Sequence, residues 1–181
     1  TNNSFGWLEN SKYKKDIEFV LGDLRDFDSV NKVIKKTKRC IHLGALIGIP
    51  YSYISPLAYL KTNVEGTYNI LESAKGYSYD DILVTSTSEI YGSAQYTPMD
   101  ENHPISPQSP YAASKVASDQ LAISYYKSFD QPIKIVRPFN VYGPRQSPRA
   151  IIPTIINQLL ISNKLSVGNT SVSRDYTYVD D

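Results

Sequence analysis

The sequence predicts an α/β domain built on a parallel sheet. Short apolar runs have the length and composition of strands, and they lie at 17–21, 39–43, 82–86 and 133–136. Helical patterns lie between or after them, at 26–36, 55–75, 110–127 and 151–161. Strands that alternate with helices in this way form parallel sheets with helical crossovers, so we expect one such sheet.

The ends of the predicted helices carry residues that helix termini prefer. Asp26 and Asp28 begin the first helix and the lysine pair 35–36 ends it, as the helix dipole favours. The pairs 55–56 and 109–110 each read Ser-Pro, an N-cap residue followed by proline at the first helical position. These capped helices follow the second and third predicted strands, as the alternation requires.

The composition is that of an ordinary globular domain. The 181 residues are 41% hydrophobic and 20% charged, and 19 Lys and Arg against 18 Asp and Glu give a net charge of +1. This balance of charges offers no electrostatic attraction for nucleic acid. The longest apolar stretch, 41–51, is about half as long as the ~20 residues that a membrane helix needs. The lone Cys40 and the lack of a secretory leader pattern favour a reducing compartment. We therefore expect a cytoplasmic protein with no nucleic-acid or membrane partner and, since no cluster has metal-ligand spacing, no metal.

Polar side chains gather where the third predicted strand ends. Ligands of parallel sheets bind beyond the carboxyl ends of the strands, so this position is a candidate site. Residues 85–89 read Thr-Ser-Thr-Ser-Glu. Hydroxyl groups are poor core material and suit hydrogen bonds to a ligand, and a carboxylate in a cleft can act as a base. A solvated turn with Glu89 exposed is the alternative.

Tyr111 and Lys115 are four residues apart in a predicted helix and therefore share one face. An ammonium beside the phenol stabilises the phenolate, so we expect Lys115 to lower the pKa of Tyr111 toward neutrality. A tyrosine base of this kind suits the oxidation of an alcohol. The spacing alone is a weak signal, because a surface tyrosine lying on a lysine stem has the same pattern.

Taken in order, several segments resemble the extended short-chain dehydrogenase/reductase family of nucleotide-sugar enzymes. The hydroxyl cluster 85–92 is followed by Tyr111 and Lys115 and then by Arg-Pro-Phe-Asn-Val-Tyr-Gly-Pro-Arg at 137–145. Four more segments are similar to family motifs: 22–26 to the adenine turn, 42–45 to the strand end beneath the pyrophosphate, 62–67 to the central helix and 174–180 to the start of the sugar-nucleotide lobe. The resemblance covers nearly the whole chain and implies a Rossmann-type doubly wound parallel sheet.

The resemblance also implies the cofactor, the substrate class and the site residues. NAD is the expected cofactor, with NADP an open alternative, and a nucleotide sugar is the expected substrate. The residues implied as catalytic are Thr87, Ser88, Glu89, Tyr111 and Lys115. Those implied to bind the cofactor are Asp23, Leu24, Leu43, Gly44, Ala45, Thr85, Ser86, Tyr111, Lys115 and Pro138, and those implied to bind the substrate are Thr87, Asn140, Arg149 and Arg174.

The acidic residue at 89 narrows the expected reaction. Family members that are 4-epimerases usually carry a small hydroxyl residue there, whereas 4,6-dehydratases carry an acid that removes the proton on C5. The Ser-Glu pair at 88–89 is similar to that of GDP-mannose dehydratases and UDP-glucuronate decarboxylases, while dTDP-glucose dehydratases carry Asp-Glu. The segments 45–53 and 147–154 resemble the N-acetylglucosamine-nucleotide 4,6-dehydratases of legionaminic-acid biosynthesis. We therefore expect a 4,6-dehydratase that forms a 4-keto-6-deoxy sugar nucleotide. A 4-epimerase or decarboxylase on the same scaffold and a non-catalytic dimerisation module are the alternatives.

Two parts of the family pattern are missing from the chain. Neither Gly-x-x-Gly-x-x-Gly nor Gly-x-Gly-x-x-Gly occurs, and residues 1–8 look like the stretch that follows the family's second strand. We therefore expect 1–181 to form a partial NAD(P)-binding Rossmann domain, truncated at both ends, without the first strand–helix–strand unit. Residues 165–181 are expected to begin the substrate lobe.

The resemblance further implies a homodimer that packs two helices per subunit into a four-helix bundle. The helices would be 55–75 and 111–127. The side chains expected to be partly covered by the partner are Leu121, Ala122, Tyr125 and Tyr126.

Neither histidine is expected to carry chemistry. His42 falls in the second predicted strand beside Cys40, and both are expected to pack in the core. His103 falls in a loop rich in Pro, Ser and Asn, at 92–110, and is expected to be solvated.

Overall fold

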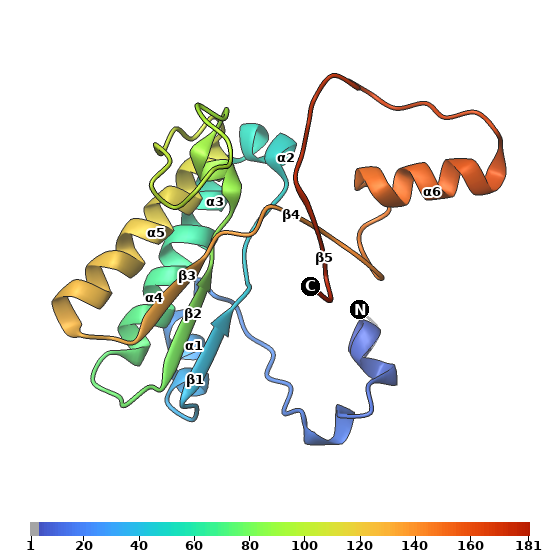
Figure 1. Ribbon diagram of the computed structural model, residues 1–181. Helices are drawn as coiled ribbons and strands as arrows, with labels where there is room; N and C mark the ends of the chain where they lie inside the picture. Colours follow the sequence, from blue (N-terminus) through green and yellow to red (C-terminus); the bar gives the residue numbers. More distant parts are fainter. Residues whose placement is uncertain (1–3) are drawn as a thin grey trace.

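A three-stranded parallel sheet forms the centre of the computed structural model, which describes residues 4–181 (Figure 1). Its strands are β1 (Arg39–His42), β2 (Asp81–Thr85) and β3 (Ile133–Val136), in the order β1-β2-β3. All three coincide with predicted strands to within a residue or two, and the parallel pairing with helical crossovers confirms the predicted Rossmann-like α/β fold.

Three helices cover one face of this sheet: α1 (Phe27–Ile34), α4 (Gly66–Ala74) and α5 (Pro110–Phe129). The core forms where they meet the inward-facing residues of β2. Its members are Val30, Ile34, Ile70, Leu71, Ala74, Tyr79, Ile82, Val84, Ala122 and Tyr125. The opposite face of the sheet is open, and Ile41, Leu43 and Val136 are exposed there.

Two helix caps form as predicted and one does not. The Asp26 carboxylate accepts from the backbone N–H groups of Asp28 and Ser29, and the Ser109 hydroxyl accepts from that of Ala112 at 3.0 Å. The Ser55 side chain makes no such bond, because the chain is already helical before it, in α2 (Ile49–Ile54).

The long helix predicted at 55–75 is divided into three parts. These are α3 (Pro56–Tyr59), a π-helical turn η3 (Leu60–Glu65), and α4. Insertions of π-helix are rare and frequently mark functional sites. The periodicity of the sequence predicted helix here but could not separate the π turn from its α-helical neighbours.

The predicted strand at 17–21 does not form, and this prediction is wrong. The short 3-10 helices η1 (Gly6–Asn10) and η2 (Lys14–Asp16) precede an extended stretch that pairs with no strand in residues 4–181. Phe19 stacks on Phe5, with ring centroids 3.7 Å apart, and Leu21 is fully exposed. An apolar run becomes a strand only where a neighbouring strand can take its hydrogen bonds, and here the edge of β1 does not. Residues 1–3, where the expected family-like stretch 1–8 begins, lie outside the described part of the chain.

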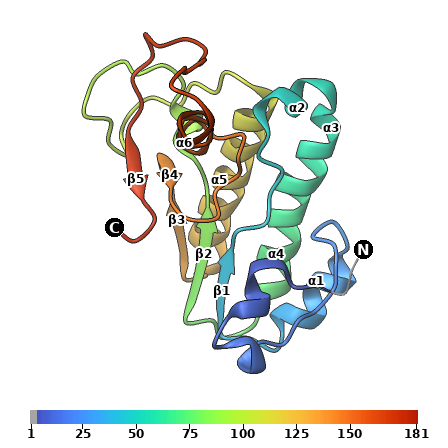
Figure 2. The ribbon, with the colours of Figure 1, turned by 90° about the vertical axis from the view of Figure 1, so that its right-hand side faces the viewer.

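The C-terminal segment lies to one side of the sheet (Figure 2). The strands β4 (Asn140–Tyr142) and β5 (Tyr176–Tyr178) pair in parallel, with Asn140 opposite Tyr176. Between them runs α6 (Ile151–Ile161), which matches the predicted helix and has no buried residue. The family-like segment 174–180 thus contains the strand β5, and both β4 and β5 are too short for the sequence to predict.

Part of the dimer prediction is wrong. Ala122 and Tyr125 are buried in the core of their own subunit, where the Tyr125 hydroxyl donates to the Glu72 carboxylate of α4 at 2.6 Å. Tyr126, by contrast, is 54% exposed, and Leu121 is half-buried at the edge of the core. Only the outward-facing side of α5 can therefore meet a partner.

Candidate functional site

Strand β2 leads directly into a short 3-10 turn, η4 (Ser88–Tyr91), that carries the predicted catalytic carboxylate. The Thr87 hydroxyl caps this turn by accepting from the backbone N–H of Glu89 at 3.2 Å. The backbone N–H of Ser88 donates to the Pro138 carbonyl at 3.1 Å, which ties the turn to the end of β3. The ends of β2 and β3 thus hold Thr87, Ser88 and Glu89 in one short, anchored stretch.

Tyr111 and Lys115 lie on the first turns of α5, and both are buried, with exposed fractions of 7% and 3%. The Lys115 ammonium donates to the carbonyl of Thr85, the last residue of β2, at 2.6 Å. The ring of Tyr111 meets the ring of Tyr59 edge-on, with centroids 6.2 Å apart. The helix therefore places the predicted base and its lysine directly beside the end of β2.

The expected lowering of the Tyr111 pKa is not found. Burial raises the pKa of Tyr111 above its ordinary value, because the phenolate loses its hydration. A hydrogen bond with Thr87 acts in the opposite direction, and the Glu89 carboxylate raises this pKa further. Burial also lowers the pKa of Lys115, whose ammonium is engaged by the Thr85 carbonyl.

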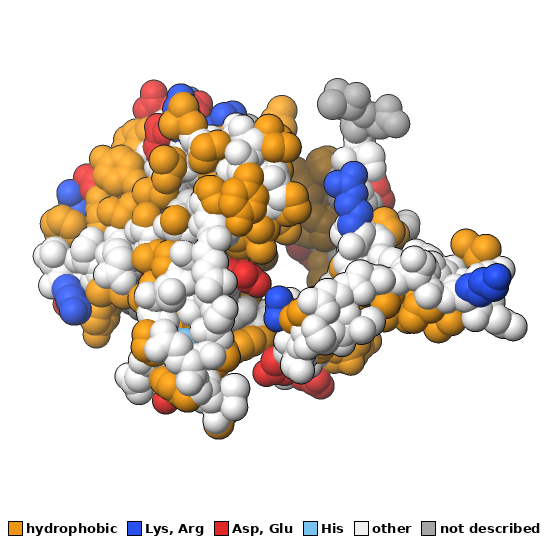
Figure 3. Space-filling view, turned by 90° about the horizontal axis from the view of Figure 1, so that it is seen from above, with side chains coloured by type: hydrophobic (Ala, Val, Ile, Leu, Met, Phe, Trp, Pro, Cys, Tyr) orange, Lys and Arg blue, Asp and Glu red, His pale blue; other side chains and the backbone are white. Residues whose placement is uncertain are grey.

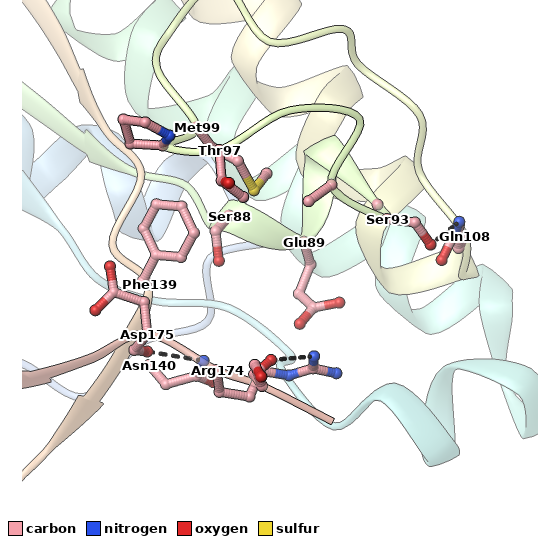
Figure 4. Close-up of a pocket in the computed structure, with 14 residues that line it drawn as sticks. Ser88, Glu89, Ser93, Thr97, Met99, Gln108, Phe139, Asn140, Arg174 and Asp175 are labelled. Atoms are coloured by element: carbon pink, nitrogen blue, oxygen red, sulfur yellow. Dashed lines mark hydrogen bonds between the residues drawn. The ribbon is translucent and has the colours of Figure 1, made fainter. Parts of the chain in front are cut away.

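Glu89 faces a cavity of about 510 Å³ between η4, the following loop and the C-terminal segment. Glu89 points into it from η4, while Asn140 and Arg174 line it from the opposite side (Figure 4). Figure 3 shows the corresponding hollow on the surface, with acidic and basic side chains beside it. The structure therefore brings four of the predicted site residues, Ser88 with these three, around one cavity.

The C-terminal side of the cavity is held mainly by backbone contacts. Asn140 donates to the Asp175 carbonyl through both its backbone N–H, at 3.3 Å, and its side-chain amide, at 3.2 Å. Arg174 donates to the Ser173 carbonyl, and its guanidinium lines the cavity. Arg149 is exposed in the stretch before α6 and does not line this cavity, so the structure does not unite it with the other predicted substrate residues.

The residues expected to bind a cofactor surround the ends of β1 and β2. A hollow of about 210 Å³ lies beside Asp23 and Leu24 and is lined mainly by apolar side chains of α1. The Arg25 guanidinium holds the pKa of the Asp23 carboxyl at about 2. A Cβ added at Gly44 would lie only 2.5 Å from the Leu24 side chain. The backbone at Gly44 therefore lies this close to Leu24 because residue 44 has no side chain. An apolar hollow beside a carboxylate suits an adenine ring.

Asn63 and His103 are two of the buried polar side chains that were not among the predicted site residues. The Asn63 amide, in η3, exchanges hydrogen bonds with the backbone of Leu46 and donates to the Ser114 hydroxyl at 2.9 Å. It thereby ties the loop after β1 to the turn of α5 that separates Tyr111 from Lys115. A polar residue at an inward position of the helical pattern was the available signal.

His103 is the second of these buried polar side chains. The prediction that it is solvated is wrong, since it is only 2% exposed.

His42 packs in the core as predicted. Its ring lies 3.1 Å from the Thr67 hydroxyl, and burial lowers its pKa to about 4. Residues 4–181 contain neither a helix able to cross a membrane nor a cluster of side chains able to hold a metal ion.

The arrangement suits proton transfer at a polar ligand. A buried phenol has a lysine on its own helix face and the hydroxyl of Thr87 close enough to lower its pKa. A carboxylate close enough to raise the phenol's pKa faces the adjoining cavity. Two basic or neutral donors, Arg174 and Asn140, line the far side and suit an anionic group such as a diphosphate.

Comparison with known proteins gives consistent similarities. The family model described as GDP-mannose 4,6 dehydratase matches residues 2–181. The dTDP-D-glucose 4,6-dehydratase of Dictyostelium discoideum is 34% identical over an alignment of 180 residues that covers 92% of this chain and 42% of that protein. The crystal structure of dTDP-glucose 4,6-dehydratase from Streptomyces venezuelae, solved with NAD bound, has a TM-score of 0.80 at 31% identity and aligns over 88% of this chain and 50% of that one. The UDP-N-acetylglucosamine 4-epimerase of Methanobrevibacter ruminantium M1 has a TM-score of 0.87 at 30% identity and aligns over 98% of this chain and 59% of that one. The chain spans about half the length of the curated relatives it matches.

Proposed function

Because the chain belongs to the GDP-mannose 4,6-dehydratase family of NAD-dependent epimerases and dehydratases, we propose that the protein containing it is a nucleotide-sugar 4,6-dehydratase. The product would be a 4-keto-6-deoxy sugar nucleotide. The observation that carries this proposal is the position of Glu89, a carboxylate that faces the cavity and lies close to the buried Tyr111. An epimerase acts at C4 alone and has no use for a second base at this place.

NAD is the cofactor of this proposal, and the residues present fit part of it. The hollow beside Asp23 and Leu24 would hold the adenine, and the Gly44 turn would lie against the middle of the molecule. Tyr111 and Lys115 would lie at its reactive end. NAD would accept hydride from C4 of the sugar and return it to C6.

Tyr111 accepts the proton of the C4 hydroxyl in the first step. Its phenolate is disfavoured by burial, so the Thr87 hydroxyl, which lowers the pKa of Tyr111, helps this step. The Lys115 ammonium, fixed by the Thr85 carbonyl, provides the positive charge on the same face. Thr87 would also hydrogen-bond the C4 oxygen.

Glu89 acts in the second step. Once C4 is a ketone, the C5 proton is acidic, and the Glu89 carboxylate removes it. The C6 hydroxyl leaves as water, and its proton comes from Glu89 directly or through water, because position 88 holds serine rather than an acid. After hydride has reached C6, C5 takes a proton that can come from solvent.

Asn140 and Arg174 are proposed to bind the diphosphate of the nucleotide sugar. Both line the cavity opposite Glu89, so a bound diphosphate would direct the sugar toward η4. Arg149 has no support from the geometry and is not part of this proposal.

The second candidate is a 4-epimerase. It is favoured by the similarity to the UDP-N-acetylglucosamine 4-epimerase, which has a higher TM-score than the dehydratase described above. Both reactions begin with oxidation at C4, so Tyr111 and Lys115 keep the same roles in either. Only the role of Glu89 differs.

The Glu89→Gln variant separates the two. UDP-N-acetylglucosamine, GDP-mannose and dTDP-glucose would be supplied in deuterated water to the protein that contains this chain. We expect wild-type protein to form a 4-keto-6-deoxy product with deuterium at C5. Glu89→Gln should still reduce bound NAD but release at least 100-fold less product, since a positioned base contributes roughly 10²- to 10⁴-fold.

Glu101→Gln, an exposed acid on the neighbouring loop, is the control and should be as active as wild type. A wild-type product inverted at C4 without deuterium at C5 would establish the epimerase instead. Normal turnover by Glu89→Gln would remove Glu89 from the mechanism.

A further inference from the structure

The loop between η4 and α5 forms a wall of the cavity. The members of this loop that line the cavity, together with Gly92 at its start, are Ser93, Ala94, Thr97, Pro98, Met99 and Gln108. Regular secondary structure is lacking in 92–108, so specific side-chain contacts must set the path of the backbone.

His103 lies at the buried centre of the loop, with both ring nitrogens engaged. Nδ1 lies 3.1 Å from the Pro104 carbonyl, which can only accept, so this nitrogen carries the proton. Nε2 therefore accepts, and the backbone N–H of Gln95 donates to it at 2.9 Å. The neutral imidazole, with its proton on Nδ1, thus connects Gln95 to Pro104, which lie far apart along the loop.

Two tyrosine rings enclose the imidazole. Tyr91 meets it edge-on at 5.4 Å between centroids, and Tyr96 packs against it at 4.8 Å. The Tyr91 hydroxyl accepts from the Arg137 guanidinium at 2.9 Å. His103 is thereby linked through Tyr91 to the end of β3, where Arg137 follows the last strand residue.

We propose that His103 is a positioning residue for the sugar part of the substrate. It fixes Gln95 and, through it, the wall residues from Ser93 to Met99 that face Glu89. This inference rests on the proposed function, because it assigns the sugar to the cavity that Glu89 faces. The diphosphate, by contrast, is assigned to Asn140 and Arg174 on the other side and does not depend on the loop.

The test compares three variants in the protein that contains this chain. His103→Leu removes the acceptor and leaves the Gln95 N–H without its partner. His103→Gln can present an oxygen near the place of Nε2 and should restore part of the function. Asn102→Ala, at an exposed neighbouring position, is the matched control.

We expect His103→Leu to raise KM for the best substrate of the nucleotide-sugar panel roughly tenfold, with kcat within about twofold of wild type, because an unpaired donor is costly. His103→Gln should give an intermediate KM, and Asn102→Ala should match wild type. The affinity for UDP alone, measured by calorimetry, should stay unchanged. Amide hydrogen exchange at Gln95 should accelerate in His103→Leu.

Other outcomes overturn the inference. An unchanged KM together with unchanged exchange at Gln95 would show that His103 does not hold the wall. An equal loss of affinity for UDP would indicate general collapse of the site. If wild-type protein acts on none of the panel, the proposed function fails, while Gln95 exchange still tests whether His103 fixes the loop.

Discussion

The body of the molecule, residues 27–136, and the C-terminal segment, residues 140–181, hold their polar side chains in different ways. The body buries Lys115 and Tyr111, which are almost inaccessible, and leaves Glu89 partly exposed at the cavity. The C-terminal segment has no buried residue, and Asn140 and Arg174 are held by a few hydrogen bonds to backbone. The phenol and ammonium proposed to act at C4 are therefore embedded in a packed core, whereas the groups proposed to bind the diphosphate lie on a lightly supported surface.

This difference predicts different responses to substitution. Changes in the body should affect the chemical step, ionisation or folding. Changes in the C-terminal segment should affect ligand affinity and leave the chemical step intact. Four substitutions test the contrast, from the largest expected effect to the smallest.

Tyr111→Phe should give the largest effect. The ring remains and the packing against Tyr59 is kept, but the hydroxyl proposed to accept the C4 proton is lost. We expect kcat to fall roughly 10²- to 10⁴-fold with little change in thermal stability. Tyr126→Phe, at an exposed position on the same helix, should behave as wild type. Near-normal turnover by Tyr111→Phe would break the assignment of the base.

Asp119→Ala tests the packing of the body. Asp119 is fully buried and accepts from the Arg137 guanidinium at 3.0 Å, and Arg137 is only 17% exposed. Removing the carboxylate leaves a buried cation without its partner, so the free energy of unfolding should fall by about 3–5 kcal/mol. Asp81→Ala, which breaks the exposed pair with Lys134, should cost no more than about 1 kcal/mol. Equal losses in urea denaturation would contradict the contrast between buried and exposed pairs.

Arg174→Gln tests the C-terminal segment. Loss of a charged donor to the diphosphate should raise KM for the nucleotide sugar roughly tenfold, with kcat nearly unchanged. Arg149→Gln is the comparison variant, because Arg149 lies outside the cavity and its KM should match wild type. A larger effect at Arg149 than at Arg174 would mean that the substrate lies elsewhere.

Thr87→Val should give the smallest effect, a change in pH dependence. The Thr87 hydrogen bond lowers the pKa of Tyr111, so its loss should raise that pKa further. The proposed base, Tyr111, must be deprotonated to act, so kcat/KM should rise with pH as Tyr111 loses its proton. In Thr87→Val this rise should occur at higher pH than in wild type. Thr37→Val, a change remote from the site, should leave the profile in place. A shift toward lower pH would contradict the proposed role of Thr87.

The sequence predicted more about the body than about its surroundings. The strands β1, β2 and β3 and the caps at Asp26 and Ser109 depend on local patterns, and the structure has them where expected. The strand predicted at 17–21 does not form, because a strand needs a neighbouring strand to pair with, and a local sequence pattern cannot show whether one is present. The short strands β4 and β5 have too few residues to give a periodic signal.

The sequence predicted which residues belong to the candidate site, but not how deeply they are buried or how their surroundings shift their pKa values. Glu89, Asn140 and Arg174 line one cavity, yet the pKa of Tyr111 is raised rather than lowered, because burial of the phenol is the largest influence on it. His103 was expected in water because its loop is polar. Its burial depends on Tyr91 and Tyr96 folding around it, which is a tertiary effect.

Gly92 at the start of the cavity wall has a consequence for how such a protein can diversify. Its φ of +66° lies in the left-handed region, and a Cβ there would collide with the Ser106 carbonyl, so the position is closed to every other amino acid. His103 is also fixed, in the middle of the same loop. Ser93, Ala94 and Thr97 lie between Gly92 and His103 and are exposed, so the fold depends little on their side chains. Substitutions can accumulate at these three positions while the ends of the loop stay fixed. A change of sugar preference can therefore arise in the wall without disturbing the carboxylate or the phenol behind it.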